Sequence, residues 1–184
     1  MLMKTSEWLV SVLFPDLQDN NQRIACIYGC ELWLYTFIST LGLLLIGLLM
    51  KSFFESAIII AIFYTCQSHG GGFHASSHIR CFLTMSIGLL GGLIMLHMQI
   101  SHAYLPYIGM VSIFVLLAFP IRLHPNKQYL KSNEQTLCTR SYCVTTTIVL
   151  CIIALFFIDG GSLFDSGCIG IFLAALSRLF AVTH

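Results

Sequence analysis

Charged residues are scarce in this sequence. Only 9% of its 184 residues are Asp, Glu, Lys or Arg, against roughly 25% in an average soluble domain. The formal net charge is +1, and no dense run of basic residues occurs, so the chain lacks the electrostatic pattern of a nucleic-acid-binding protein. Hydrophobic residues make up 57% of the chain and the mean hydropathy is +0.86. This composition indicates an integral membrane protein whose partner is the lipid bilayer.

The features of a cleaved signal peptide are also missing. The apolar run from Trp8 to Phe14 is short, Pro15 and Asp16 follow it, and no small-x-small cleavage site is present. We therefore expect residues 1–22 to be retained as an amphipathic helix at the membrane interface. No internal repeat, low-complexity segment or linker is visible, so we expect a single domain over 1–184.

Long apolar stretches dominate the rest of the chain. A helix needs about 20 residues to cross a bilayer, with a range of roughly 17 to 25. The sequence predicts an all-α membrane bundle of about six transmembrane helices, over residues 24–50, 53–68, 81–100, 103–121, 142–158 and 163–182. The second stretch is the shortest of the six.

The basic residues orient this bundle. If the N-terminus is inside, eight of the nine basic residues lie on the cytoplasmic side or at its boundary, and only Lys51 lies outside. This distribution follows the positive-inside rule. The longest polar stretch, 122–141, becomes a cytoplasmic loop in this topology, and the segment 69–81 faces the cytoplasm as well.

Segment 69–81 is the most unusual part of the chain, because it places three histidines, three consecutive glycines and a thiol between two apolar stretches. Irregular backbone exposed to lipid costs several kcal/mol for each unpaired peptide group, so polar, flexible sequence at a membrane boundary indicates chemistry. The thiol is that of Cys81, which has His74, His78 and Arg80 as neighbours. A nearby base or positive charge favours the reactive thiolate. The other seven cysteines lack such company, and we expect them to act as small hydrophobic residues kept reduced.

Spacing alone leaves the partner of Cys81 open. His74 is seven residues away, which is two helical turns, or about 10 Å along a straight helix. A hydrogen bond to His74 therefore requires a bend between the two residues. His78 is three residues from Cys81 and shares its helical face, so spacing favours His78.

A metal site is the alternative interpretation of the same segment. His69, His74, His78 and Cys81 supply four nitrogen and sulfur ligands, the number that a structural zinc ion takes. Their spacings of five, four and three residues match no usual paired-ligand pattern. The corresponding function is a metal-binding membrane transporter or sensor, and a scaffold without activity is a third interpretation.

The glycine and histidine motif resembles that of a known family. The run Gly71-Gly72-Phe73-His74-Ala75, with a cysteine seven residues after the histidine, is similar to the motif of the accessory gene regulator B (AgrB-like) family of bacterial quorum-sensing peptidases. The likeness extends over nearly the whole chain, through Tyr28-Gly29-Cys30-Glu31, Phe119-Pro120-Ile121 and Pro125-Asn126-Lys127.

This resemblance implies an activity. It assigns the catalytic pair to His74 and Cys81 rather than to His78, in a thiol protease without a cofactor or metal. The enzyme cleaves the acidic C-terminal tail from a small precursor peptide with an amphipathic N-terminus, forms a thioester on Cys81, and promotes closure of a cyclic (thio)lactone. The resemblance also implies a multi-pass protein of the bacterial cell membrane, with its catalytic residues at the cytoplasmic side, and favours a homodimer.

Several residues are candidates for supporting roles. Family members often carry an arginine six or seven residues before the histidine, where this chain has Gln67 and Ser68; His69 or Arg80 is the candidate to compensate. Glu31 is the first candidate to orient His74, because an ionisable residue inside a span usually faces the interior.

Residues in the loop 122–141 and in the span 81–100 each have two possible roles. Lys127 and Lys131 receive the acidic tail of the precursor, or they serve only as topology determinants. Gly88 and Gly92 pack helices closely within the bundle, which we favour, or form a dimer contact.

Overall fold

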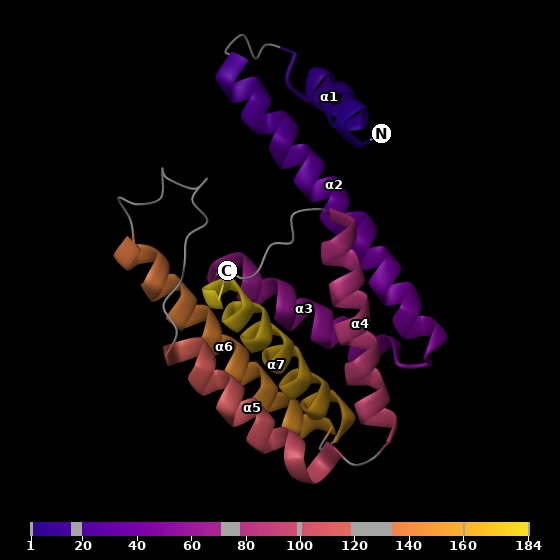
Figure 1. Cartoon of the computed structure of the whole chain (residues 1–184), viewed down its shortest axis with the longest axis vertical. Helices are drawn as coiled ribbons and strands as arrows, with labels where there is room; N and C mark the ends of the chain where they lie inside the picture. Colours follow the sequence, from indigo (N-terminus) through magenta and orange to yellow (C-terminus); the bar gives the residue numbers. More distant parts are fainter. Residues whose placement is uncertain are drawn as a thin grey trace. The chain divides into compact units, whose positions relative to one another are not determined.

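The structure is all-helical, as the sequence predicts. The computed structural model describes residues 2–15, 20–70, 78–98, 101–118, 134–159 and 161–183. They contain no strand and form the helices drawn in Figure 1, namely α1 (Leu2–Leu13), α2 (Asn20–Leu49), α3 (Phe53–Gly70), α4 (His78–His97), α5 (Ser101–Ala118), α6 (Glu134–Asp159) and α7 (Ser162–Thr183).

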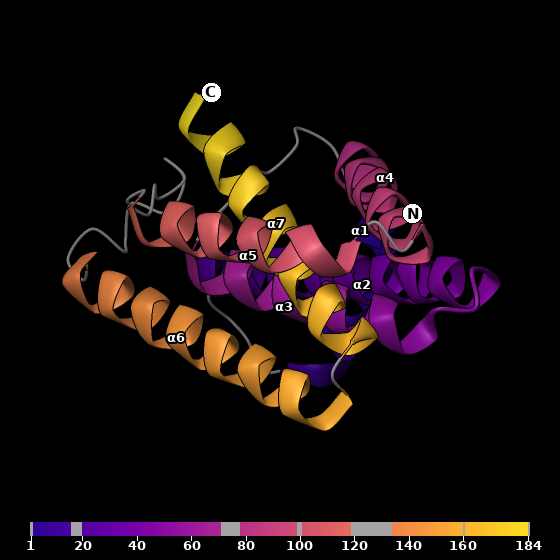
Figure 2. The same ribbon diagram turned by 90° about the horizontal axis from the view of Figure 1, so that it is seen from below.

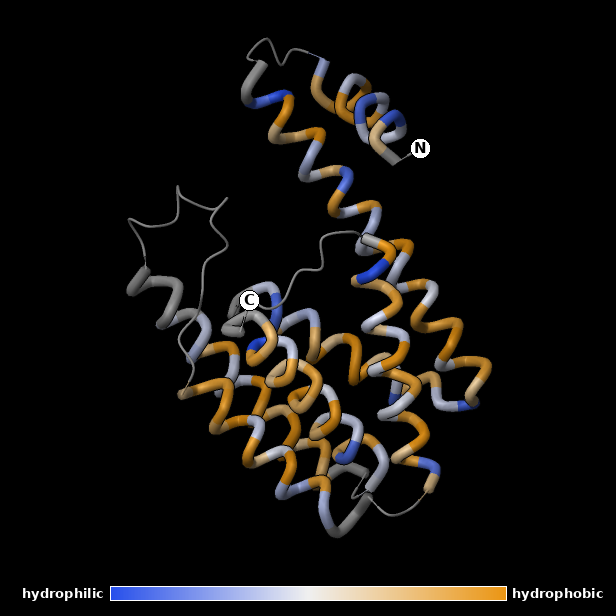
Figure 3. The backbone as a smooth tube through the Cα atoms, viewed as in Figure 1, coloured by the Kyte–Doolittle hydropathy of each residue, from blue (hydrophilic) through white to orange (hydrophobic). Residues whose placement is uncertain are grey.

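Most of each predicted apolar stretch lies within one of the helices α2 to α7. Three of these helices are long and apolar enough to cross a membrane, by length and composition, over Gln22–Leu49, Ile79–His97 and Ser162–Phe180. The apolar parts of α3, α5 and α6 are shorter, over Phe53–Ser68, Tyr104–Ala118 and Ser141–Phe157. Figure 3 shows that α5 and α6 are mainly hydrophobic along their described length, whereas hydrophilic and hydrophobic residues mix in α1.

Two predicted boundaries differ from the structure. Helix α6 begins at Glu134, so residues 134–141 are helical and not part of the loop predicted over 122–141. Polarity keeps a segment out of the bilayer, but Glu, Gln, Leu and Arg are good helix formers. At the other end of the chain, α1 covers only Leu2–Leu13 of the helix expected over 1–22. Pro15 follows, and a proline disfavours helical backbone in the residue before it.

The chain divides into two compact units, residues 1–42 and 43–184. In the first unit, α1 buries a narrow side that carries Ser6 and Val10, four residues apart. It exposes large apolar side chains elsewhere, including Trp8 at 63% exposure, Val12 and Leu13. An amphipathic helix with an exposed apolar face suits the membrane interface.

The second unit begins with a tight turn between α2 and α3. The amide of Lys51 donates to the carbonyl of Leu48, and the amide of Ser52 donates to the carbonyl of Gly47. Lys51 adopts the left-handed backbone conformation, with φ of 57°. These are the bonds of a Schellman motif, which ends a helix and satisfies its last carbonyls. A Cβ on Gly47 would collide with the Ser56 side chain, so glycine lets α3 start close against the end of α2.

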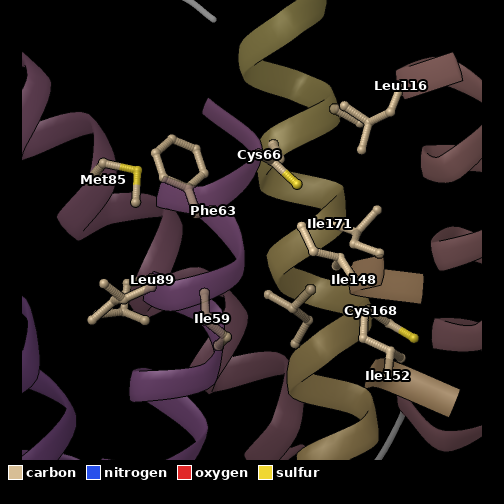
Figure 4. Close-up of a cluster of buried hydrophobic side chains, with 14 of the residues drawn as sticks. Ile59, Phe63, Cys66, Met85, Leu89, Leu116, Ile148, Ile152, Cys168 and Ile171 are labelled. Carbon is tan, nitrogen blue, oxygen red and sulfur yellow. The ribbon is translucent and has the colours of Figure 1, made fainter. Parts of the chain in front are cut away.

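Helix α7 is the centre of the second unit. It packs against α3, α4, α5 and α6 (Figures 1 and 2). Figure 4 shows side chains from the surrounding helices gathered about its ribbon. The buried residues that α7 itself contributes to this core are Cys168, Ile169, Ile171, Ala174 and Ala175.

Glycines allow the neighbouring helices to approach α7 closely. In α4, a Cβ on Gly92 would lie 2.6 Å from Cγ2 of Ile169, and one on Gly88 would lie 3.1 Å from Cδ2 of Leu173. The pattern of Gly88 and Gly92 therefore packs α4 on α7 inside the bundle, as we favoured from the sequence. Gly92 lies against Ile169 and Gly88 against Leu173, so residue numbers rise along α4 as they fall along α7. The two helices are therefore antiparallel.

Similar pairs give the direction of the other neighbours. Helices α3 and α5 run parallel to α7 and α6 runs antiparallel, as shown by the pairs Gly170 with Ile62, Arg178 with Cys66, Gly109 with Cys168, Arg178 with Leu116, Gly167 with Ile152 and Arg178 with Tyr142. The last residues of α3, α5 and α7 and the first residues of α4 and α6 therefore lie at one end of the unit. We call this the Arg178 end.

The glycine contacts predict opposite effects for two neighbouring substitutions. Gly92→Ala should lower the free energy of unfolding by about 1 to 3 kcal/mol, because its methyl group overpacks against the β-branched Ile169. Gly91→Ala is the matched control: a Cβ there meets nothing within 4 Å, and alanine is the better helix former. Unfolding midpoints of the purified proteins in one detergent measure both. Equal midpoints for the two variants would contradict the packing described here.

Candidate functional site

The Arg178 end contains both ends of the segment that carries the glycine and histidine motif. Helix α3 ends at Gly70 and α4 begins at His78. Residues 71–77, which include His74, lie outside the described residues, as do the side chains of His69 and His78. The proposed pairing of His74 with Cys81, and the bend it needs, therefore stays a prediction.

Cys81 lies in the first turn of α4, is half-buried and is not part of a disulfide. The amides of a helix's first turn have no acceptor within the helix. They and the helix dipole favour negative charge nearby, which stabilises a thiolate or an oxyanion. Cys81 therefore lies where the start of a helix favours negative charge.

Three of the predicted supporting residues lie at the same end as Cys81. Gln67 is half-buried and Ser68 is exposed in the last turn of α3, while Arg80 is exposed in the first turn of α4. The Ser68 hydroxyl donates to the carbonyl of Thr65, 3.1 Å away. The structure therefore brings the polar candidates of the 67–81 region to the end of the bundle that carries Cys81.

The remaining candidates are not placed relative to Cys81. Glu31 is half-buried in α2 and belongs to the first unit, so its role in orienting His74 stays a prediction. Lys127 and Lys131 lie outside the described part of the chain. The two helix ends that bound their segment, Ala118 of α5 and Glu134 of α6, both belong to the Arg178 end.

The described residues provide no support for the interpretation as a metal site. Among them, no three His, Cys, Asp or Glu side chains are grouped closely enough to hold a metal ion. Three of the four residues in that interpretation, His69, His74 and His78, have side chains beyond the described set. No disulfide is formed by the cysteines that the structure describes, namely Cys26, Cys30, Cys66, Cys81, Cys143, Cys151 and Cys168.

Hydroxyl side chains in the apolar helices are satisfied locally. They donate to the carbonyl of the residue three or four positions earlier, which removes an otherwise unpaired donor from an apolar setting. Side chains bonded in this way are Thr36, Thr40, Ser56, Thr65, Thr84, Ser86, Ser112, Thr146, Thr147 and Ser166. These hydroxyl bonds therefore have a structural explanation.

In the sequence, Arg178 is one of the eight basic residues that indicate the cytoplasmic side. Its side chain is 4% exposed, and Nη1 donates to the Leu116 carbonyl over 2.5 Å, across 62 positions in sequence. Its position inside the apolar stretch 163–182 could have indicated a functional role, because charged residues are costly in a membrane and usually functional. Its partner required the tertiary structure.

Comparison with known proteins agrees with the motif. The family model for accessory gene regulator B matches residues 4–178, nearly the whole chain. Neither the curated proteins nor the solved structures contain a match. With the matched segment running from α1 to Arg178, the chain belongs to the accessory gene regulator B family, bacterial membrane proteins that take part in processing quorum-sensing peptides.

Proposed function

We propose that this protein is a membrane-embedded cysteine endopeptidase that removes the C-terminal tail of a small precursor peptide and promotes its cyclisation. Cys81 is the nucleophile and His74 is the general acid and base. The observation that carries the proposal is the position of Cys81, half-buried in the first turn of α4 and next to the segment that holds His74. Membership of the family supports it.

The chemistry has two transfers. His74 takes the proton of Cys81, and the thiolate attacks the carbonyl carbon of the scissile peptide bond. When the C–N bond breaks, His74 protonates the departing amine, and the retained part of the peptide stays on Cys81 as a thioester. A thiol or hydroxyl within that peptide then attacks the thioester carbonyl, gives its proton to His74, and releases Cys81 with closure of the ring.

The site must favour ring closure over hydrolysis. Exchange of one thioester for another is nearly balanced in free energy, so the enzyme gains most by holding the internal nucleophile close and by excluding water. A half-buried cysteine at the end of a helix bundle suits both requirements. The amides of the first turn of α4 are the proposed donors to the oxyanion.

We further propose that the protein crosses the membrane six times through α2 to α7, with the Arg178 end at the cytoplasmic side. The alternation of helix directions around α7 supports this topology, because consecutive spans must alternate. The basic residues support the orientation by the positive-inside rule. Lys51, in the turn between α2 and α3, is then extracellular.

This topology predicts opposite accessibility at two positions. Lys51→Cys should react with a membrane-impermeant maleimide in intact cells, whereas Lys127→Cys should react only after permeabilisation. Both variants are made in a chain whose native cysteines other than Cys81 are replaced, and gel-shift labelling with and without permeabilisation is measured. Labelling of both positions from outside would contradict the proposed six spans.

The catalytic assignment predicts a specific pattern of lost activity. Cys81→Ala and His74→Ala should each abolish cleavage of the precursor, because one removes the nucleophile and the other removes the proton carrier. His78→Ala should retain cleavage. Cys143→Ala is the matched cysteine control, since Cys143 is an exposed thiol near the start of α6, and it should cleave at the wild-type rate. Product formation by purified protein in vesicles is followed by mass spectrometry.

The same variants separate the metal interpretation from the peptidase. Zinc content is measured on the purified wild type, His69→Ala and His74→Ala. Stoichiometric zinc that is lost on either substitution, together with intact cleavage in His74→Ala, would replace the peptidase with the metal-binding transporter or sensor.

We also propose that Lys127 and Lys131 bind the acidic tail of the precursor. Reversal of both charges to Glu should raise the KM for a precursor with an acidic tail about tenfold at low salt, the size expected for two partly screened charge contacts. A precursor whose acidic tail residues are replaced by amides should be processed equally by both proteins. An unchanged KM at low salt would leave these lysines with a topological role alone.

A homodimer is part of the proposal. One face of α4 is excluded as its contact surface. Gly88 and Gly92 both pack against α7 within the chain, so their face of α4 is not available to a second copy. The exposed apolar faces of the helices remain, and cross-linking in the native membrane tests for the dimer.

A further inference from the structure

Arg178 is a buried charged residue at the end of the bundle that is named after it. Its side chain is 4% exposed, although it belongs to the apolar helix α7. Nη1 donates to the Leu116 carbonyl, and within the described part of the chain Nε is buried without a hydrogen-bond partner. The Cys66 thiol and the Tyr142 phenol lie close enough to interact electrostatically with the guanidinium. One side chain thus forms a hydrogen bond to α5 and lies within electrostatic range of residues of α3 and α6.

The bond to Leu116 has a clear physical role. Leu116 is in the last turn of α5, where the final carbonyls of a helix have no amide partner within the helix. An unsatisfied carbonyl is costly away from water. A cation at this position also interacts favourably with the negative end of the helix dipole. Arg178 therefore stabilises the last turn of α5.

The proximity of Arg178 to Cys66 concerns the end of α3. Cys66 is buried in the last two turns of α3, followed by Gln67 and Ser68. Figure 4 shows Cys66 and Leu116 beside the same stretch of the α7 ribbon. Helix α3 leads into residues 71–77, which hold His74, and α5 leads into residues 119–133, which hold Lys127 and Lys131. Arg178 thus lies between the starting points of both segments on which the proposed function depends.

We propose that Arg178 is a positioning residue for peptide processing, which holds the ends of α3 and α5 in register on α7. The inference rests on the proposed function in assigning the processing reaction to those two segments. A shift of about 1 Å in a catalytic group can reduce a rate by about a hundredfold. Loss of the guanidinium should therefore slow the acylation of Cys81 without removing any group that touches the peptide.

A simple role in stability makes a different prediction. Replacing a buried charge by an apolar side chain of similar volume is often neutral or stabilising, so Arg178→Met is expected to fold. If Arg178 served stability alone, the folded Arg178→Met protein would process peptide at the wild-type rate.

The experiment compares folded, monodisperse variants in vesicles. Arg178→Met should lower kcat about tenfold or more, with KM changed less than about threefold, as expected for misplaced catalytic groups. Arg178→Lys keeps the charge and a donor for Leu116, and it should recover most of the lost kcat. Should Arg178→Met not fold, Arg178→Gln replaces it with the same expectation, since its shorter side chain cannot reach both helix ends.

Asp165→Asn is the matched control, because Asp165 is equally buried in α7 but lies near its other end. Its folded fraction should retain the wild-type kcat. A second readout needs no activity: hydrogen–deuterium exchange in the last turns of α3 and α5 should rise together in Arg178→Met and stay unchanged in Asp165→Asn.

The two readouts distinguish failure of this inference from failure of the proposed function. Wild-type kcat in folded Arg178→Met, or faster exchange confined to one of the two helix ends, overturns the positioning role. If the wild type itself processes no precursor, the proposed function fails, and the exchange measurement still decides whether Arg178 couples α3 to α5.

Discussion

The close approach of four helices to α7 is the constraint on which the second unit depends. Lipid tails are as apolar as leucine side chains, so helices in a bilayer associate through van der Waals packing and hydrogen bonds rather than through the hydrophobic effect. Small residues make that packing possible by letting backbones come near. Here they are contributed by three helices, as Gly88, Gly92, Gly109, Gly167 and Gly170. The directions of α3 to α7, and with them the gathering of helix ends, follow from these contacts.

The gathering of helix ends places polar residues at one end of an apolar bundle. The Arg178 end brings together the end of α3, the start of α4 with Cys81, and the two helix ends that bound the segment containing Lys127. Its polar character contrasts with the apolar interior of the bundle, where hydroxyls are bonded to their own helices. Arg178 is the exception, because its guanidinium reaches from α7 to a carbonyl of α5.

Much of this arrangement was predictable from the sequence, since the length of an apolar run determines where a membrane helix can form. The six stretches match α2 to α7, and the glycine pattern of α4 indicated its packing. The apolar part of α6, Ser141–Phe157, agrees with the span predicted over 142–158, but the helix itself begins eight residues before that span, at Glu134, because polarity marks the bilayer boundary and not the helix boundary. The bond from Arg178 to Leu116 spans 62 positions and could be seen only in the tertiary structure. The pairing of His74 with Cys81 came from the family motif, because spacing along a helix favours His78.

The central claim is that Cys81 carries the peptide as a thioester, and the intact mass of the protein tests it directly. A precursor whose internal nucleophile is replaced by alanine cannot close the ring, so the acyl-enzyme should accumulate after rapid acid quenching. The expected result is a mass increase equal to the tail-free peptide less one water, located on Cys81 by peptide mapping and removed by hydroxylamine. Release of the tail with no adduct on Cys81 at any quench time, or an adduct that survives in Cys81→Ala, would contradict it.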